Sequence, residues 1–197
     1  HFGTHDLAGF GAEGLNVALA AAGALFDYAR STQRQTLAHI TGLKVESEGD
    51  YLRMDAQTRR NLEISETLRG EASPTLLSLL DLTETSMGSR WLRHALHHPL
   101  ASRNACRERH AVVGALLGDA GDGPLSAVAT ALRPIADIER IATRIALTSV
   151  RPRELAALRE SLAALDAVRA PLPQADSNLL AHIHTDLATP VDTLLVL

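Results

Sequence analysis

Apolar residues recur at steps of three and four positions over most of this chain, which is the spacing of one face of an α-helix. Residues 137–148 carry four of them on one side, namely Ile138, Ile141, Ala142 and Ile145. A longer run follows Pro152 at the same steps, with Leu155, Leu158, Leu162, Leu165 and Val168. This run predicts a single long helix whose apolar seam extends about 20 Å, at about 1.5 Å per residue, and packs against a partner.

Residues that favour helix ends bracket the helices predicted before residue 120. Asp55 and Thr85 are candidate N-caps, and Ser73 precedes Pro74, which suits the first position of a helix. Ser102 is a candidate N-cap of a further helix, which Gly118 can close. These signals predict four helices between residues 55 and 118.

The N-terminal part of the chain has a different pattern. Residues 13–32 are rich in alanine and apolar nearly all round, which predicts a buried helix. In the segment GLKVESEGDYLRMD, two short β-prone runs flank Ser47 to Asp50, which predicts a small β-hairpin or an extended joint. Since the helical period resumes after it, we expect a domain boundary there, with residues 1–40 in one domain and residues 41–197 in the next.

Composition supports an all-α fold. Of the 197 residues, 46% are hydrophobic but only 3% are aromatic, so alanine and leucine supply most of the core. No apolar run reaches the roughly 18 residues of a membrane span. The single cysteine, Cys106, cannot form an internal disulfide, which favours a reducing compartment such as the cytoplasm. The chain begins at His1 and ends in an apolar run, which is typical of a piece of a longer protein.

Positive charge is local in a chain whose net charge is −4. We expect a helix over residues 85–98 in which an apolar stripe, including Met87 and Trp91, lies opposite a cationic face. That face holds Arg90, Arg93, His94 and His97, and further basic residues follow at Arg103, Arg107, Arg109 and His110. The face is interpreted as solvated, or as paired with acids elsewhere. The alternative hypothesis is a phosphate contact through Arg93, Arg103, Arg107 and Arg109.

Motifs of enzymes and metal sites are weak or missing. His94, His97 and His98 lack a cysteine or a carboxylate cluster to complete a metal site. The sole lysine, Lys44, does not follow a glycine-rich loop, so the chain has no P-loop, and no nucleophile elbow is present. The charges of ADIERIATRIA are expected to be solvated or to form ion pairs between helices. We therefore expect neither an enzyme site nor a bound cofactor in these residues.

Several blocks of the chain resemble the MutS family of DNA mismatch repair proteins. MDAQTRRNLEI and LLSLLDLTETSMGSRWLRHALHHPL are similar to the signature of the family's helical core domain, and ADIERIATRIAL and RPRELAALRESL are similar to later core helices. FGTHDLAGFG and AAAGALFDYARSTQR resemble the end of the preceding connector domain. The resemblance implies the connector's end and the first part of a core with long, lever-like helices. It also implies a dimeric parent protein that binds mismatched duplex DNA, uses ATP and Mg²⁺ in another domain, and works with a MutL-type partner.

The resemblance assigns architectural roles to two groups of residues. The first is Asp55, Thr58, Arg59, Arg60, Asn61, Leu62 and Glu63, and the second is Met87, Gly88, Ser89, Arg90 and Leu92. They are expected to fix helix junctions at the base of the core. Gly88 would permit close approach of helices, while Arg59, Arg60 and Arg90 would bind carbonyls or carboxylates. Ser86 stands where the family usually has proline, and serine remains a suitable residue for a helix start.

Three functions follow from these observations. The first is a mechanical relay between a mismatch-binding domain and an ATPase domain outside this chain. The second is a free-standing helical module that binds nucleic acid through the basic residues between Arg90 and His110. The third is a helical scaffold that dimerises through the seam from Leu155 to Val168.

Overall fold

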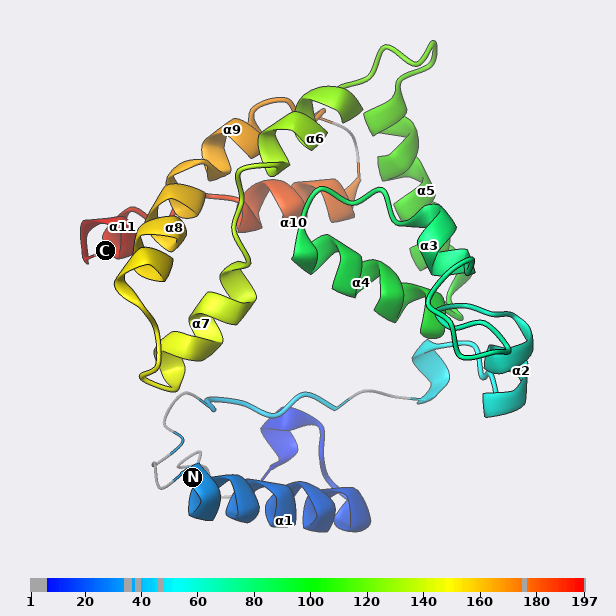
Figure 1. Cartoon of the computed structure of the whole chain (residues 1–197), viewed down its shortest axis with the longest axis vertical. Helices are drawn as coiled ribbons and strands as arrows, with labels where there is room; N and C mark the ends of the chain where they lie inside the picture. Colours follow the sequence, from blue (N-terminus) through cyan, green and yellow to red (C-terminus); the bar gives the residue numbers. More distant parts are fainter. Residues whose placement is uncertain (1–6, 34–36, 38–39, 46–47, 175–176, 197) are drawn as a thin grey trace. The chain divides into compact units, whose positions relative to one another are not determined.

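The computed structural model describes residues 7–33, 37, 40–45, 48–174 and 177–196 (Figure 1). It divides into two compact units, His1–Glu48 and Gly49–Leu197, which are described separately. Within the described residues, all the regular secondary structure is helical, apart from one isolated β-bridge. The all-α fold class is therefore confirmed.

The first unit consists of the 3₁₀-helix η1 (Ala8–Phe10) and helix α1 (Asn16–Gln33). The prediction that this alanine-rich helix is buried is wrong, because Val17 is 87% exposed and Leu25 is 68% exposed. One face of α1 borders an apolar pocket together with Ile40 and Leu43. The rest of α1 stays exposed because the described part of this unit contains no second α-helix to cover it.

The joint between the predicted domains pairs with a distant segment. Residues 42–45 have no regular structure, Glu48–Asp50 form the 3₁₀-helix η2, and residues 46–47, including Ser47, lie outside the described residues. Tyr51 forms an antiparallel bridge with Leu100, with the Leu52 amide donating to the Pro99 carbonyl at 2.8 Å. The β-hairpin is therefore not confirmed, and the β-prone residues pair instead with extended backbone beyond a helix. The boundary after residue 40 stays a prediction.

The second unit begins with four helices, α2 (Ala56–Asn61), α3 (Leu76–Leu80), α4 (Ser86–His97) and α5 (Arg103–Leu117). The predicted caps Asp55, Thr85 and Ser102 are confirmed, since each side chain accepts a hydrogen bond from the backbone amide three residues later. The prediction that Ser73 caps α3 is wrong. Thr75 is the N-cap, because Thr75 and Ser78 each accept a bond from the other's amide, which satisfies two free donors.

Gly118 ends α5 as predicted. Its φ of 71° lies in the left-handed region, which glycine adopts without steric cost. A Cβ at this position would lie 2.5 Å from the Gly123 amide nitrogen. Both the backbone conformation and the close approach of the following turn therefore require glycine.

Six further helices complete the second unit: α6 (Leu125–Leu132), α7 (Ile138–Ala146), α8 (Pro152–Ala163), α9 (Leu165–Arg169), α10 (Asn178–Asp186) and α11 (Val191–Val196). The prediction of a single long helix from Pro152 is wrong, because the helix is interrupted at Ala164. The Ala167 amide bonds to the Ala164 carbonyl, which tightens the chain to the i+3 pattern of a 3₁₀ turn. The break directs α8 against α7 and α9 against α6.

One buried apolar cluster of the second unit lies between α7 and α8. Ile141, Leu158 and Leu162 form this cluster. Ser161, only 1% exposed, accepts a hydrogen bond from the Ala136 amide at 2.9 Å and donates to the Ala157 carbonyl at 2.7 Å. A second packed pair is α5 with α10, which carry the buried residues Val112 and Leu180.

Candidate functional site

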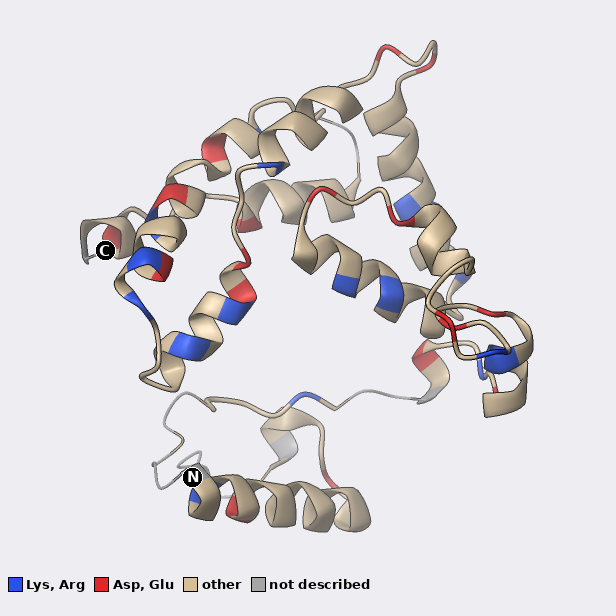
Figure 2. Ribbon diagram, viewed as in Figure 1, with Lys and Arg blue, Asp and Glu red and all other residues tan. Residues whose placement is uncertain are grey.

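Arg90 joins α4 to the beginning of α7. Its guanidinium donates to both carboxylate oxygens of Asp137, at 2.6 and 2.7 Å, and to Glu139 at 2.6 Å. Asp137 is also the N-cap of α7, because Oδ1 accepts from the Arg140 amide at 3.1 Å. The hydrogen bonds from Arg90 hold the pKa of Asp137 below its usual value. Figure 2 shows basic residues on α4 and charges of both signs on α7.

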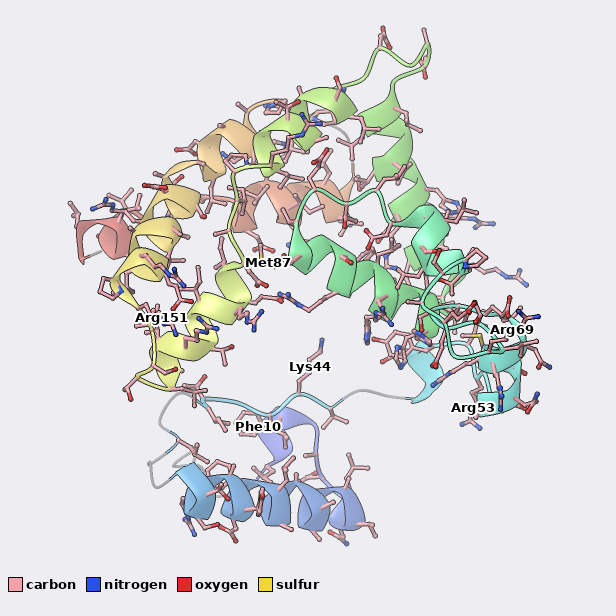
Figure 3. The ribbon with its side chains drawn as sticks, viewed as in Figure 1. Phe10, Lys44, Arg53, Arg69, Met87 and Arg151 are labelled. Carbon is pink, nitrogen blue, oxygen red and sulfur yellow. The ribbon has the colours of Figure 1, made fainter. Side chains whose placement is uncertain are left out.

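The start of α4 is fixed by the carboxylate that ends α3. Ser89 Oγ donates a hydrogen bond to Asp81, and Thr83 Oγ1 donates to the same carboxylate at 2.6 Å. These bonds, that of Ser89 first, lower the pKa of Asp81. A Cβ on Gly88 would lie 3.1 Å from Thr83 Cβ, so Gly88 permits close approach of the turn before α4 rather than of another helix. Met87 lies at this end of α4 (Figure 3).

The first of the two groups of family residues, Asp55 to Glu63, is called the first signature group, and it begins with a capped helix. Asp55 accepts from the Thr58 amide at 2.6 Å, and this backbone bond is the main cause of the lowered pKa of Asp55. Asn61 Oδ1 accepts from Gln57 Nε2 at 2.9 Å, one helical turn apart. Both contacts are local to α2.

The end of the first signature group ties α2 to α3. Glu63 has a φ of 44°, and its carboxylate accepts from the Leu68 amide at 2.7 Å. The Glu63 carbonyl accepts from the Leu76 amide at 3.1 Å. Leu62 is 55% exposed, whereas Leu92 in the second group is partly buried. Glu63 is therefore the member of the first group that fixes a junction between helices.

Among the described residues, Arg59 and Arg60 have neither the carbonyl nor the carboxylate partners that were expected. Neither side chain forms an ion pair or a hydrogen bond within the part of the chain that the structure describes, and Arg59 Nε is buried. Both line a pocket of about 370 Å³ together with His97 and Ser65. Ser65 Oγ lies 2.8 Å from His97 Nε2, and burial, followed by the charge of Arg59, lowers the pKa of His97.

The cationic face is divided between different environments. Arg93, Arg103 and Arg107 are exposed and form no ion pair with any described residue. Arg109 instead stacks over the Trp91 ring, at 5.1 Å from its centroid. The prediction that Trp91 belongs to the buried stripe is wrong, because the side chain is 55% exposed and is covered in part by this arginine.

The histidines near the end of α4 form an aromatic cluster. The rings of His94 and His98 stack with centroids 4.4 Å apart, and Tyr51 meets His98 edge-on at 5.6 Å. His97 is separate from this cluster and faces Ser65. Within the described residues, no three histidine, cysteine or acidic side chains are grouped so that they could hold a metal ion.

Further ion pairs between helical segments confirm one expectation for ADIERIATRIA. Asp137 and Glu139 bind Arg90, and Arg144 of α7 binds Glu154 of α8. Arg133, which precedes this segment, pairs with Glu84 at 3.2 Å. The charges of α7 therefore connect it to α4 and to α8.

Comparison with protein-family models decides the family. Residues 57–196 match MutS domain III, and residues 1–41 match MutS domain II. The first match alone covers more than two thirds of the 197 residues. This chain belongs to the MutS family. It thus carries segments that match two domains of a DNA mismatch repair protein, and the MutS domain III match includes Arg90, Asp137 and the Arg59 pocket. No helix among its described residues has both the length and the apolar character needed to cross a bilayer.

Two features of the site were not predicted from the sequence, namely the pairing of Asp137 with Arg90 and the pocket beside Arg59. Asp137 was expected to be solvated or to form an ion pair, but nothing in the sequence pattern connected it to Arg90, 47 residues away. The pocket beside Arg59 also escaped detection, because Ser65 and His97 come together through an irregular segment after α2. No spacing rule relates residues across such a segment.

Proposed function

We propose that this chain is the helical relay of a mismatch-recognition ATPase, transmitting conformational change between mismatch-binding and nucleotide-binding domains outside these residues. The observation that carries the proposal is the paired contact of Arg90 with Asp137 and Glu139. It joins the first half of α4 to the N-cap of α7, 47 residues away. In this proposal the chain itself is not an enzyme and binds no cofactor, while ATP and Mg²⁺ bind elsewhere in the parent protein.

The contacts around Arg90 support a stiff connection. Ser89 binds Asp81 at the end of α3, and Arg133 binds Glu84 in the turn before α4. Two separate ion pairs thus connect residues 84–90 with residues 133–139. A displacement of α4 would pull directly on the N-terminus of α7 and, through Arg144 and Glu154, on α8.

The parent's partners belong to the same proposal. We infer a homodimeric, cytoplasmic protein that binds mismatched duplex DNA and cooperates with a MutL-type protein. The matches to MutS domains II and III support the inferred role in DNA mismatch repair. The proposed relay requires no direct contact between this chain and DNA.

The nucleic-acid-binding alternative has one observation in its favour. Arg93, Arg103 and Arg107 are exposed and unpaired within the described residues, so they are available to phosphates. The dimerising scaffold is disfavoured, because Leu158 and Leu162 are already buried against Ile141 within the chain. Only the first alternative therefore needs a separate test.

A duplex titration separates the relay from the nucleic-acid-binding module. The 197-residue chain would be titrated against a fluorescent duplex, with and without one mismatch, at low and near-physiological salt. The relay predicts no binding. Equal binding to both duplexes that is lost with salt would support the module, with a slope of log K against log[salt] of roughly −3 for three phosphate contacts. Preference for the mismatch would contradict the placement of the mismatch reader outside this chain.

The relay itself is tested in the full-length protein that contains this chain. Arg90→Gln should leave mismatch affinity unchanged but abolish the effect of the mismatch on ATP turnover. Arg103→Gln is the matched control, since it removes one exposed arginine without breaking an ion pair in the described residues. Unchanged mismatch-dependent turnover in a folded Arg90→Gln protein would refute the relay.

A further inference from the structure

The pocket beside α2 combines positive charge with hydrogen-bond donors. It measures about 370 Å³ and is lined by Arg59 and Arg60 from α2, by Ser65, Glu66 and Gly70 from the segment before α3, and by His97 from α4. Its volume lies within the range of small-molecule sites, which is about 300–1,000 Å³. It is distinct from the Arg90 junction and plays no part in the proposed relay.

The arginine side chains of this pocket have no acceptors among the described residues. Arg59 Nε is buried and has no hydrogen-bond partner among the described atoms. A buried donor without an acceptor is unfavourable, and in native structures such groups usually bind water or a ligand. Arg60 is exposed and also forms no ion pair in the described part of the chain. Two guanidinium groups at one pocket are therefore available to an anion.

The local charge balance favours an anion although one acid is present. Glu66 also lines the pocket, but it forms no ion pair with either arginine. Burial, followed by the charges of Arg59, His98 and Arg93, lowers the pKa of His97, as expected in a positive environment. With His97 neutral, the formal charge of the lining is positive.

Ser65 can supply a further donor. Its hydroxyl oxygen lies 2.8 Å from His97 Nε2. In the tautomer whose Nε2 carries the proton, His97 donates to Ser65, and the Ser65 hydroxyl proton is free to donate to a ligand. Phosphate oxygens can accept from two guanidinium groups and a hydroxyl at once, and arginine's planar fork suits such oxygens.

We propose that this pocket binds the phosphate group of a small ligand, held by Arg59, Arg60 and the Ser65 hydroxyl. The source of the phosphate is either inorganic phosphate or a small phosphate ester. The volume of the pocket leaves room for the organic part of an ester. Duplex DNA is a different class of ligand, and its binding is an outcome of the test.

Calorimetric titration of the 197-residue chain at constant ionic strength tests the proposal. The probes are inorganic phosphate, ribose 5-phosphate and acetate, and NMR of the His97 ring reports whether binding occurs at the pocket. Phosphate should bind, move the His97 resonances and outcompete acetate. Tighter binding of the ester than of phosphate would identify an ester as the ligand.

Arg59→Gln should weaken phosphate binding about 10-fold to 100-fold, the loss expected for one charge-assisted hydrogen bond. Arg59→Lys keeps the charge but not the fork and should give an intermediate loss, which also covers the case in which Arg59→Gln does not fold. Arg159→Gln should bind as the unaltered chain does, since Arg159 is exposed, lies outside the pocket and belongs to neither group of candidate phosphate contacts. Equal losses in Arg59→Gln and Arg159→Gln, an unmoved His97 ring, or binding of duplex DNA without binding of either phosphate probe would overturn the proposal.

Discussion

Removing the Ser161 hydroxyl should weaken the connection between α8 and the segment that leads into α7. Ser161 is 1% exposed, and its Oγ is the acceptor for the Ala136 amide at 2.9 Å. In Ser161→Ala this amide loses its acceptor, which costs about 1–3 kcal/mol. The Ala157 carbonyl still accepts its helical bond from residue 161, so the second lost bond adds little.

Alanine also has a higher helix propensity than serine, which returns up to about 0.5 kcal/mol. The expected net loss is therefore about 0.5–3 kcal/mol of unfolding free energy. For a domain of this size the midpoint of thermal unfolding should fall by roughly 1–12 °C.

Urea unfolding followed by far-UV circular dichroism at 25 °C measures this loss. Thr143→Ala is the control, because Thr143 also donates to a carbonyl one helical turn earlier, at 2.9 Å, but is exposed. Its stability should change by less than about 0.5 kcal/mol. The reasoning fails if Ser161→Ala is as stable as the unaltered chain with the same dependence on urea, because Ala136 would then not need this acceptor.

Two further predictions concern the end of α5 and the Arg90 junction. Gly118→Ala should destabilise the chain by more than about 1 kcal/mol, because φ is 71° and the new Cβ would approach the Gly123 nitrogen to 2.5 Å. Gly114→Ala is the control: this helical glycine has open space around it, so alanine should stabilise the chain by about 0.4–1 kcal/mol. Equal effects in urea unfolding would contradict this. Because the folded-state pKa of Asp137 is lowered, its contribution to stability is present above the unfolded-state value of 3.8 and is lost as pH falls through the folded-state value. The difference in unfolding free energy between the unaltered chain and Asp137→Asn should therefore shrink below about pH 4; a difference independent of pH in urea titrations would show that the Asp137 charge does not stabilise the fold.

Local chemistry explains why most helix starts could be predicted. Asp55, Thr85 and Ser102 each bind an amide three residues away, so the cap depends only on adjacent sequence. The same rule failed at Ser73, because the reciprocal bonds of Thr75 and Ser78 offered a better start two residues later. Residue type alone therefore does not decide which of two candidate residues caps a helix. The conformation of the local backbone decides it.

Packing explains what the apolar period could not predict. The spacing from Leu155 to Val168 continues through Ala164, and alanine is a strong helix former. The break nevertheless occurs there, because α8 packs on α7 while α9 packs on α6. The same limit applies to the Arg59 pocket, which depends on the left-handed backbone of Glu63 and on the irregular segment after it.

The Arg90 junction shows why a surface ion pair can matter for relay more than for stability. Arg90 is 46% exposed, so its bonds with Asp137 are weakened by water and contribute modestly to folding. Asp137 nevertheless has two roles, since the carboxylate that binds Arg90 also caps α7. The position of α4 is thereby coupled to the first turn of α7. Asparagine at 137 would retain the cap and lose the charge, whereas alanine would lose both, so these two changes separate the anchoring of α7 from its connection to α4.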